Sequence, residues 1–130
     1  MDIAKTLDNY YKFGIQINDY ELRINLLESR YEQMCLDEDI EIGEGQSMEE
    51  IERKIKKLKR EKQELEFIKN RIDNAIGMLD ERHQLFFVER YVEKRTHLEI
   101  SHRMYVDPQT CYRWRKDIIE LLDDVFKDNI

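Results

Sequence analysis

Residues 96–122 read THLEISHRMYVDPQTCYRWRKDIIELL, and this stretch decides how the C-terminal part of the chain folds. It predicts two helices joined by a tight turn at Tyr105-Val106. Thr96 is a residue type that caps helices, and Asp107 caps the second helix, with Pro108 at its first position, where a missing N–H costs nothing. Apolar residues of the second helix recur every three or four positions and predict one buried face. They are Cys111, Trp114, Ile118, Leu121, Leu122 and Val125.

The opposite face of this second helix carries hydrogen-bonding and basic side chains. Residues 95–116 hold five basic and two acidic side chains, a net charge of +3. When a helix lies in the major groove of DNA, such side chains contact base edges and phosphates. A purely structural helix pair is the alternative. We predict a surface for double-stranded DNA made of Gln109, Thr110, Tyr112, Arg113, Arg115 and Lys116.

The residues upstream extend the pattern, because LDERHQLFFVERY (79–91) leads into VEKRTHLEIS (92–101). Residues 78–125 resemble the promoter-reading C-terminal domain of bacterial sigma factors, region four. In that family a helix that ends in an aromatic residue is followed by a short connection, a Glu-Ile-small triplet and the recognition helix. Tyr91 and the triplet Glu99-Ile100-Ser101 match these features. The chain lacks room for the domain with which a full sigma factor melts promoter DNA.

A small chain that combines a helical N-terminal region with such a motif is similar to phage late-gene regulators of the ArpU type. The resemblance implies a transcription regulator of phage or prophage origin that reads promoter DNA. It also makes RNA polymerase a candidate partner. Two alternatives stay open. One is the small subunit of a phage terminase, which packages DNA. The other is an adaptor that binds polymerase or a sigma factor without contacting DNA.

Composition predicts an all-α protein, since 4 Gly, 1 Pro and 39% charged residues leave little of the turn chemistry that a sheet needs. No apolar run approaches membrane-spanning length, and the N-terminus lacks the pattern of a signal peptide. Cys35 and Cys111 are isolated, which suits reduced thiols. We therefore expect a cytoplasmic protein that does not contact a membrane, and the resemblance to phage regulators implies the cytoplasm of a bacterial host cell.

No catalytic or metal-binding motif is evident. The chain lacks a Gly-rich phosphate loop, a Ser-His-Asp candidate set and a His-Glu-x-x-His sequence. His83, His97 and His102 are expected at the surface. The sequence thus predicts a protein that is not an enzyme and that has no cofactor and no metal.

A seven-residue repeat runs without interruption from about Asp8 to Met34. Such a repeat over four heptads indicates a coiled coil, whose apolar seam faces a partner helix. The seam presents more apolar surface than one partner helix covers, so we predict a homodimer. Its predicted contact residues are Tyr10, Phe13, Ile17, Tyr20, Ile24, Leu27 and Tyr31.

A second long helix is predicted after the polar, Gly-containing loop at 36–46. Ser47 with Glu50 three residues later forms a capping box. The apolar positions again recur near every 3.5 residues, although Lys62 and Lys69 interrupt them. Residues 1–50 carry a net charge of −9 and residues 51–94 a net charge of +3. The two helices should attract each other as an antiparallel hairpin. We predict two domains, the hairpin at 1–76 and the helix-turn-helix domain at 77–130.

Overall fold

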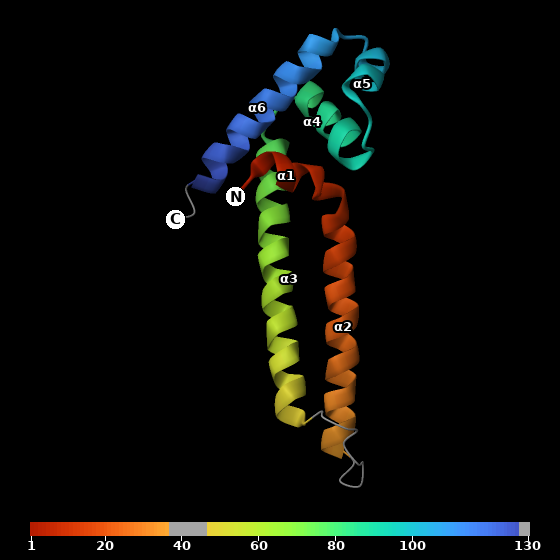
Figure 1. Cartoon of the computed structure of the whole chain (residues 1–130), viewed down its shortest axis with the longest axis vertical. Helices are drawn as coiled ribbons and strands as arrows, with labels where there is room; N and C mark the ends of the chain where they lie inside the picture. The colour runs from red at the N-terminus through yellow and green to blue at the C-terminus, as the bar shows by residue number, and fades with distance from the viewer. Residues whose placement is uncertain (37–46, 128–130) are drawn as a thin grey trace. The chain divides into compact units, whose positions relative to one another are not determined.

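The computed structural model describes residues 1–36 and 47–127, and this part of the chain contains helices and turns but no strand (Figure 1). The prediction of an all-helical fold is confirmed. From residue 37 onward, the loop expected at 36–46 lies outside the described residues. In chain order the elements are α1 (Ile3–Asp8), α2 (Tyr10–Leu36), α3 (Met48–Gly77), α4 (Glu81–Phe87), the π-helical turn η1 (Val88–Val92), α5 (His97–Met104) and α6 (Pro108–Lys127).

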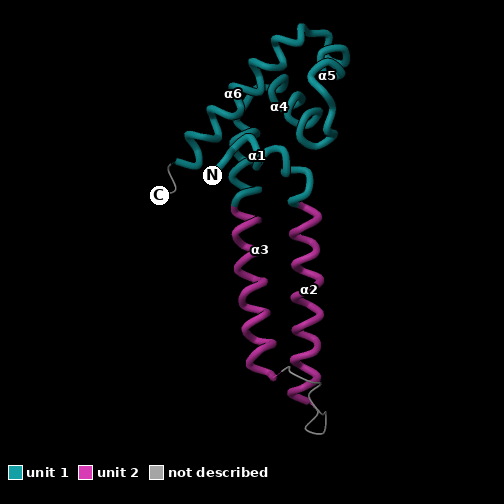
Figure 2. The backbone as a smooth tube through the Cα atoms, in the orientation of Figure 1, with its two compact units in different colours: residues 1–13, 68–130 teal, residues 14–67 magenta. Residues whose placement is uncertain are grey.

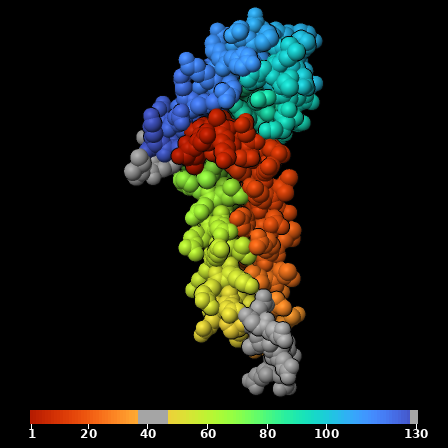
Figure 3. All heavy atoms as spheres, in the orientation of Figure 1, coloured from red at the N-terminus to blue at the C-terminus, as the bar shows by residue number. Residues whose placement is uncertain are grey.

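The chain divides into two compact units (Figure 2). Unit 1 comprises residues 1–13 and 68–130, and unit 2 comprises residues 14–67. This division differs from the expected boundary after residue 76. The first residues belong to unit 1 because the short helix α1 buries Ile3 and Leu7 and packs on α6 (Figure 3). Two apolar residues form too short a pattern to predict such a helix from the sequence.

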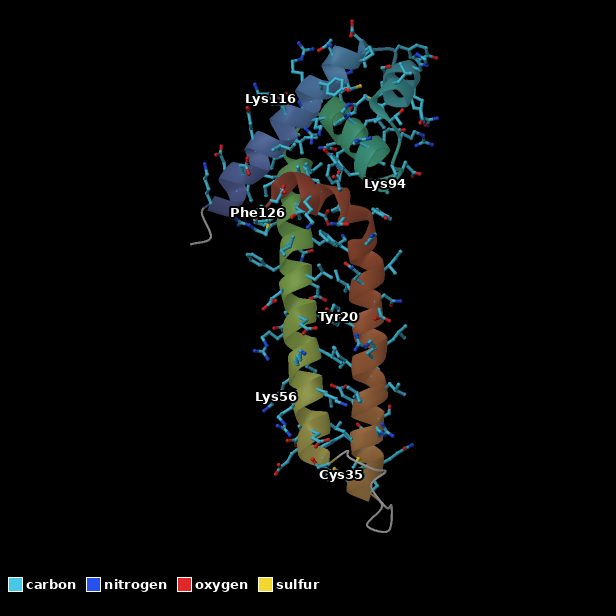
Figure 4. The ribbon with its side chains drawn as sticks, in the orientation of Figure 1. Tyr20, Cys35, Lys56, Lys94, Lys116 and Phe126 are labelled. Carbon is cyan, nitrogen blue, oxygen red and sulfur yellow. The ribbon has the colours of Figure 1, made fainter. Side chains whose placement is uncertain are left out.

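Unit 2 consists of parts of α2 and α3 that contact each other in antiparallel order. The hydroxyl of Tyr31 donates to Glu52 Oε1 at 2.6 Å, and Lys59 Nζ lies 2.9 Å from Glu28 Oε1. The residue numbers of the contacting partners thus fall along α3 as they rise along α2, which is the order of an antiparallel pair. Tyr20 points from α2 toward α3 (Figure 4). The contacts with Glu52 raise the pKa of Tyr31 to about 12, because its hydroxyl donates to that carboxylate.

The two lysines that interrupt the apolar repeat of α3 are half-buried and paired. Lys62 Nζ lies 3.1 Å from Glu21 and 3.5 Å from Glu66 within unit 2. In unit 1, Lys69 Nζ contacts Asp73 at 2.8 Å. Buried charge is tolerated where an opposite charge and hydrogen bonds replace water. The interruptions are therefore compatible with continuous packing along α3.

An aromatic cluster forms the core of unit 1. The ring centroid of Phe86 in α4 lies 5.9 Å from that of Trp114, 6.4 Å from that of Tyr91 and 5.9 Å from that of His97. Trp114 is 7% exposed, and Cys111, Ile118 and Leu122 of α6 are fully buried. The predicted apolar face of α6 is thus confirmed, and it packs on α4 and α5.

α5 and α6 begin at the predicted caps, and a tight turn joins the two helices. Thr96 Oγ1 accepts from the N–H of Glu99 at 3.2 Å, and Asp107 Oδ1 accepts from the N–H of Gln109 at 2.9 Å. Between them Tyr105 adopts the left-handed conformation, with φ 55° and ψ 45°, and the N–H of Val106 donates to Ser101 O at 3.0 Å. Buried Ser101 and Cys111 are small, which lets α5 approach α6 closely.

A buried carboxylate fixes α5 from its other side. Glu89 in η1 is 8% exposed, and its Oε2 lies 2.8 Å from Arg95 Nη1 and 3.0 Å from Arg103 Nε. The N–H of Arg95 also donates to Glu89 O at 3.0 Å. These bonds connect η1, the segment before α5 and the end of α5. The position of α5 is therefore fixed by charge as well as by apolar packing.

Replacing Tyr105 by glycine should stabilise the protein. The side chain is 94% exposed, so its removal loses little packing, whereas glycine adopts the left-handed conformation without the penalty of a Cβ. We expect the free energy of unfolding in urea to rise by about 1 kcal/mol. Tyr105→Ala is the control, because it removes the ring and keeps the penalty. An equal gain for both variants would contradict this explanation.

Candidate nucleic-acid interface

The start of α6 presents an open surface opposite its buried face. Gln109, Thr110, Tyr112, Arg113 and Lys116 line one shallow depression of about 510 Å³ together with Asp107. The structure therefore brings together five of the six residues predicted to contact DNA. Asp107 was expected only as a helix cap, and its carboxylate also lies at the edge of this surface.

Contacts within unit 1 hold several of these side chains. The ring of Tyr112 packs edge-on against His97, with centroids 4.3 Å apart, while half of its side chain stays exposed. Arg113 Nη2 donates to Thr110 Oγ1 at 3.3 Å. Lys116 extends from α6 into solvent with a side chain that is 75% exposed (Figure 4). Its ion pair with Glu120 at 3.8 Å is solvent-exposed and therefore weak.

Arg115, the sixth predicted residue, does not belong to this surface. It is half-buried, and its guanidinium lies near the hydroxyl of Tyr91. Burial raises the pKa of Tyr91, and the charge of Arg115 opposes that rise. Consecutive helical residues point about 100° apart, so Arg115 lies to one side of the face that carries Arg113 and Lys116, and its contact with DNA stays a prediction.

Charge changes sign along α6. The interface residues near its start include Arg113 and Lys116, whereas Asp117, Glu120, Asp123 and Asp124 follow and are exposed. At the start, the Asp107 carboxylate accepts from the backbone N–H of Gln109. A polyanion would therefore be attracted to the first half of α6 and repelled by the second half.

His83 connects the start of α4 to α6. Its Nδ1 lies 2.8 Å from Asp80 Oδ1 and its Nε2 lies 3.0 Å from Asp117 Oδ2, and the side chain is 16% exposed. Burial lowers the pKa of His83, but the hydrogen bonds to Asp117 and Asp80 outweigh burial and hold the pKa above its usual value. His83 is thus a half-buried link between two carboxylates, and the expectation of an exposed histidine was wrong.

His97 lies behind the interface, between Phe86 and Tyr112. Its Nε2 is buried and has no hydrogen-bond partner among the described residues. Burial lowers the pKa of His97, and the positive charges of Arg90 and Arg115 lower it further. A neutral His97 ring therefore supports Tyr112. His102 is exposed, as expected.

The residues predicted to form a dimer face α3 of the same chain. In unit 1, Tyr10 donates to Asp73 and its ring lies 4.9 Å from that of Phe87. Burial and this hydrogen bond raise the pKa of Tyr10. Phe13 is buried in unit 1 as well. The other residues of the set lie in unit 2 and are buried or half-buried along the same face of α2; they are Ile17, Tyr20, Ile24, Leu27 and Tyr31. Their packing is thus used within one chain, and homodimerisation stays a prediction.

Residues 3–124 match the family described as "Protein of unknown function (DUF722)". The chain belongs to that family. No curated protein and no solved structure matches the chain. Within the described ranges, no three His, Cys, Asp or Glu side chains gather in a group that could hold a metal ion. None of the helices described there is both long and apolar enough to cross a membrane.

The link through His83 should stabilise the protein in a pH-dependent way. Because the folded pKa is raised, the stabilisation is complete below the unfolded value of 6.5 and is lost as the pH rises through the folded pKa. We expect His83→Gln to lower the free energy of unfolding at pH 5.5 more than at pH 8.5, as measured in urea at both pH values. His102→Gln is the matched control. A loss for His83→Gln that is larger at high pH would contradict the role of the two carboxylates.

Proposed function

We propose that the protein is a DNA-binding transcription regulator of phage type. In this proposal α5, the turn at Tyr105 and α6 form a helix-turn-helix like that of sigma region four, and α2 with α3 forms a coiled-coil hairpin. The observation that carries the proposal is the common open surface of Gln109, Thr110, Tyr112, Arg113 and Lys116. Its basic and hydrogen-bonding chemistry, on a helix whose other face is buried, suits the major groove of DNA.

Each side chain of the surface has a chemical role that suits DNA. Arg113 can donate two hydrogen bonds to the O6 and N7 atoms of guanine, and Gln109 can pair with adenine in a similar way. Lys116 suits a phosphate, because its ammonium group is a point charge on a flexible stem. Thr110 and Tyr112 carry hydroxyl groups that can donate to phosphate oxygens. The surface thus combines groups that specify sequence with groups that fix position.

Size and charge together determine how α6 would meet DNA. An α-helix with its side chains is about 10–12 Å wide, and the major groove is about 12 Å wide. The acidic second half of α6 repels phosphate, so the helix would enter the groove at its N-terminal end. This orientation follows from Asp117, Glu120, Asp123 and Asp124, which exclude the second half of α6 from the DNA backbone.

The same function assigns roles to the rest of the protein. The regulator would act in the cytoplasm of the bacterial host, where it meets double-stranded DNA and RNA polymerase. The hairpin, with its paired and exposed charges, would supply a surface for a protein partner. The function involves neither catalysis nor a cofactor, because binding alone changes the access of polymerase to a promoter.

Arg113→Ala should weaken specific DNA binding. A binding site is first selected from a pool of random double-stranded DNA with the wild-type protein. We expect the variant to lose about 1–3 kcal/mol on that site, because a bidentate contact to a base is removed. Lys127→Ala, which removes a cation at the far end of α6, is the control. Failure of the wild-type protein to select any DNA would contradict the proposal and favour an adaptor that binds protein only.

Lys116→Ala should weaken binding to all DNA sequences about equally. Each phosphate contact releases counterions, so we expect the plot of log affinity against log salt to become less steep by about one. Fluorescence anisotropy on the selected site and on unrelated DNA over a series of salt concentrations measures this slope. An unchanged slope, or a loss confined to the selected site, would show that Lys116 does not contact phosphate.

A further inference from the structure

The exposed side of α2 carries an uncharged stripe. Along unit 2, the members of this outer stripe are three or four residues apart except for the adjacent Asn25 and Leu26, and every member is exposed. Ile15 and Leu26 are each 72% exposed, Leu22 is 61% and Leu36 is 86% exposed. In a chain with 39% charged residues, an entire helix face without a charge is unusual. The outer stripe consists of Ile15, Asn18, Leu22, Asn25, Leu26, Ser29, Gln33 and Leu36.

Most of the outer stripe lies opposite the face of α2 that packs on α3, while Asn25 and Leu26 at its edges also line shallow grooves beside α3. Positions 15, 22 and 29 are half a helical turn away from positions 17, 24 and 31, which face α3. The exposed face of α3 is different, because Arg53, Lys56 and Arg60 cover it; Lys56 is visible there in Figure 4. A helix face that is merely solvated carries charges, as α3 does. The outer stripe of α2 instead has the composition of a contact surface.

We propose that the outer stripe binds the outer stripe of a second copy of this chain, with the two α2 helices parallel. The stripe has no net charge that would select an acidic or a basic partner, so it is chemically complementary to itself. Asn18 and Asn25 lie within it, and an amide side chain both donates and accepts hydrogen bonds, so each can pair with its own copy. Leucine and isoleucine between them supply the apolar contact.

Charges beside the stripe determine the parallel orientation. Glu32 and Glu21, which pairs with Lys62 of α3, follow one edge, whereas Arg23 and Arg30 follow the other, where Asp19 pairs with Arg23 at 3.9 Å. A two-fold axis parallel to the helices places the acidic edge of one copy against the basic edge of the other. An antiparallel pair would place like charges together. The parallel arrangement is therefore favoured electrostatically.

The size of the stripe predicts a weak dimer. From residue 15 to residue 36 the helix is about 32 Å long, and about 10 Å of its width is available for contact. This area is at the low end of protein interfaces, so we expect a dissociation constant on the order of micromolar or weaker. In combination with the proposed function, on which this consequence alone rests, a dimer would present two interfaces to two-fold-related half-sites of DNA.

Sedimentation of the full chain without DNA tests the association itself. We expect the wild-type protein to change from monomer to dimer between about 1 and 300 µM, a range that brackets the expected dissociation constant. Leu22→Glu with Leu26→Glu should raise that constant at least ~10-fold, because dimerisation would bury unpaired charges. Gln16→Glu with Gln63→Glu adds the same charge outside the stripe and should leave it unchanged. A monomeric wild-type protein, or a double Leu variant that still dimerises, would overturn the proposal.

Cysteine cross-linking tests the orientation with variants that keep the leucines. In a Cys35→Ser background, Asn18→Cys and Ser29→Cys are made separately and treated with a mild oxidant. A parallel pair brings each residue to its own copy, so both variants should form cross-linked dimers at the same rate within about threefold. Cross-linking of one variant alone, or of neither, would indicate that the helices are not paired in parallel register and would overturn the assignment. Arg113→Ala should still dimerise, so failure of DNA binding can be distinguished from failure of dimerisation.

Discussion

The packing of α6 around Phe86 is the constraint on which unit 1 depends. Phe86 contacts Trp114, Tyr91 and His97, and these rings come from α6, η1 and α5. Because this cluster fixes which face of α6 is buried, it also fixes which face stays exposed. A rotation of α6 by one residue would bring the Arg115 guanidinium out and take a partner away from Tyr91. The packing around Phe86 therefore determines both the core of unit 1 and the exposed face of α6.

Contacts within unit 1 decide which of its basic side chains remain available at the surface, and the net charge of a segment does not show this. Residues 95–116 carry a net charge of +3 in sequence, but Arg95 and Arg103 pair with Glu89, and Arg115 contacts Tyr91. Arg113 and Lys116 remain on the interface. The internal arginines position α5 and η1, whereas the two exposed cations are available to phosphate and bases. A count of charges in the sequence thus overestimates the number of cations that a polyanion could meet on this surface.

Local patterns of the sequence predicted those features that depend on a few neighbouring residues. The caps at Thr96 and Asp107, the turn at Tyr105 and the apolar face of α6 are of this kind, since each is determined within one or two helical turns. The features that sequence did not predict depend on residues far apart in the chain. The His83–Asp117 contact joins two helices, and the inward direction of Arg115 depends on Tyr91 in η1. The fold decides which residues lie beside His83 and Arg115, and the residue types along the chain do not reveal these neighbours.

The seven-residue repeat of α2 shows why periodicity predicts a buried face but not its partner. The same apolar seam could pack on a second chain or on α3. A connection of about ten residues holds two helices of one chain at an effective concentration in the millimolar range, so the intramolecular partner wins at ordinary protein concentrations. Because α3 already covers the apolar seam of α2, a second copy of the chain can contact only another face of α2. The outer stripe lies half a helical turn away from that seam and carries no charged residue. The apolar repeat thus stabilises the folded chain, whereas the uncharged outer stripe supplies the surface proposed for dimerisation.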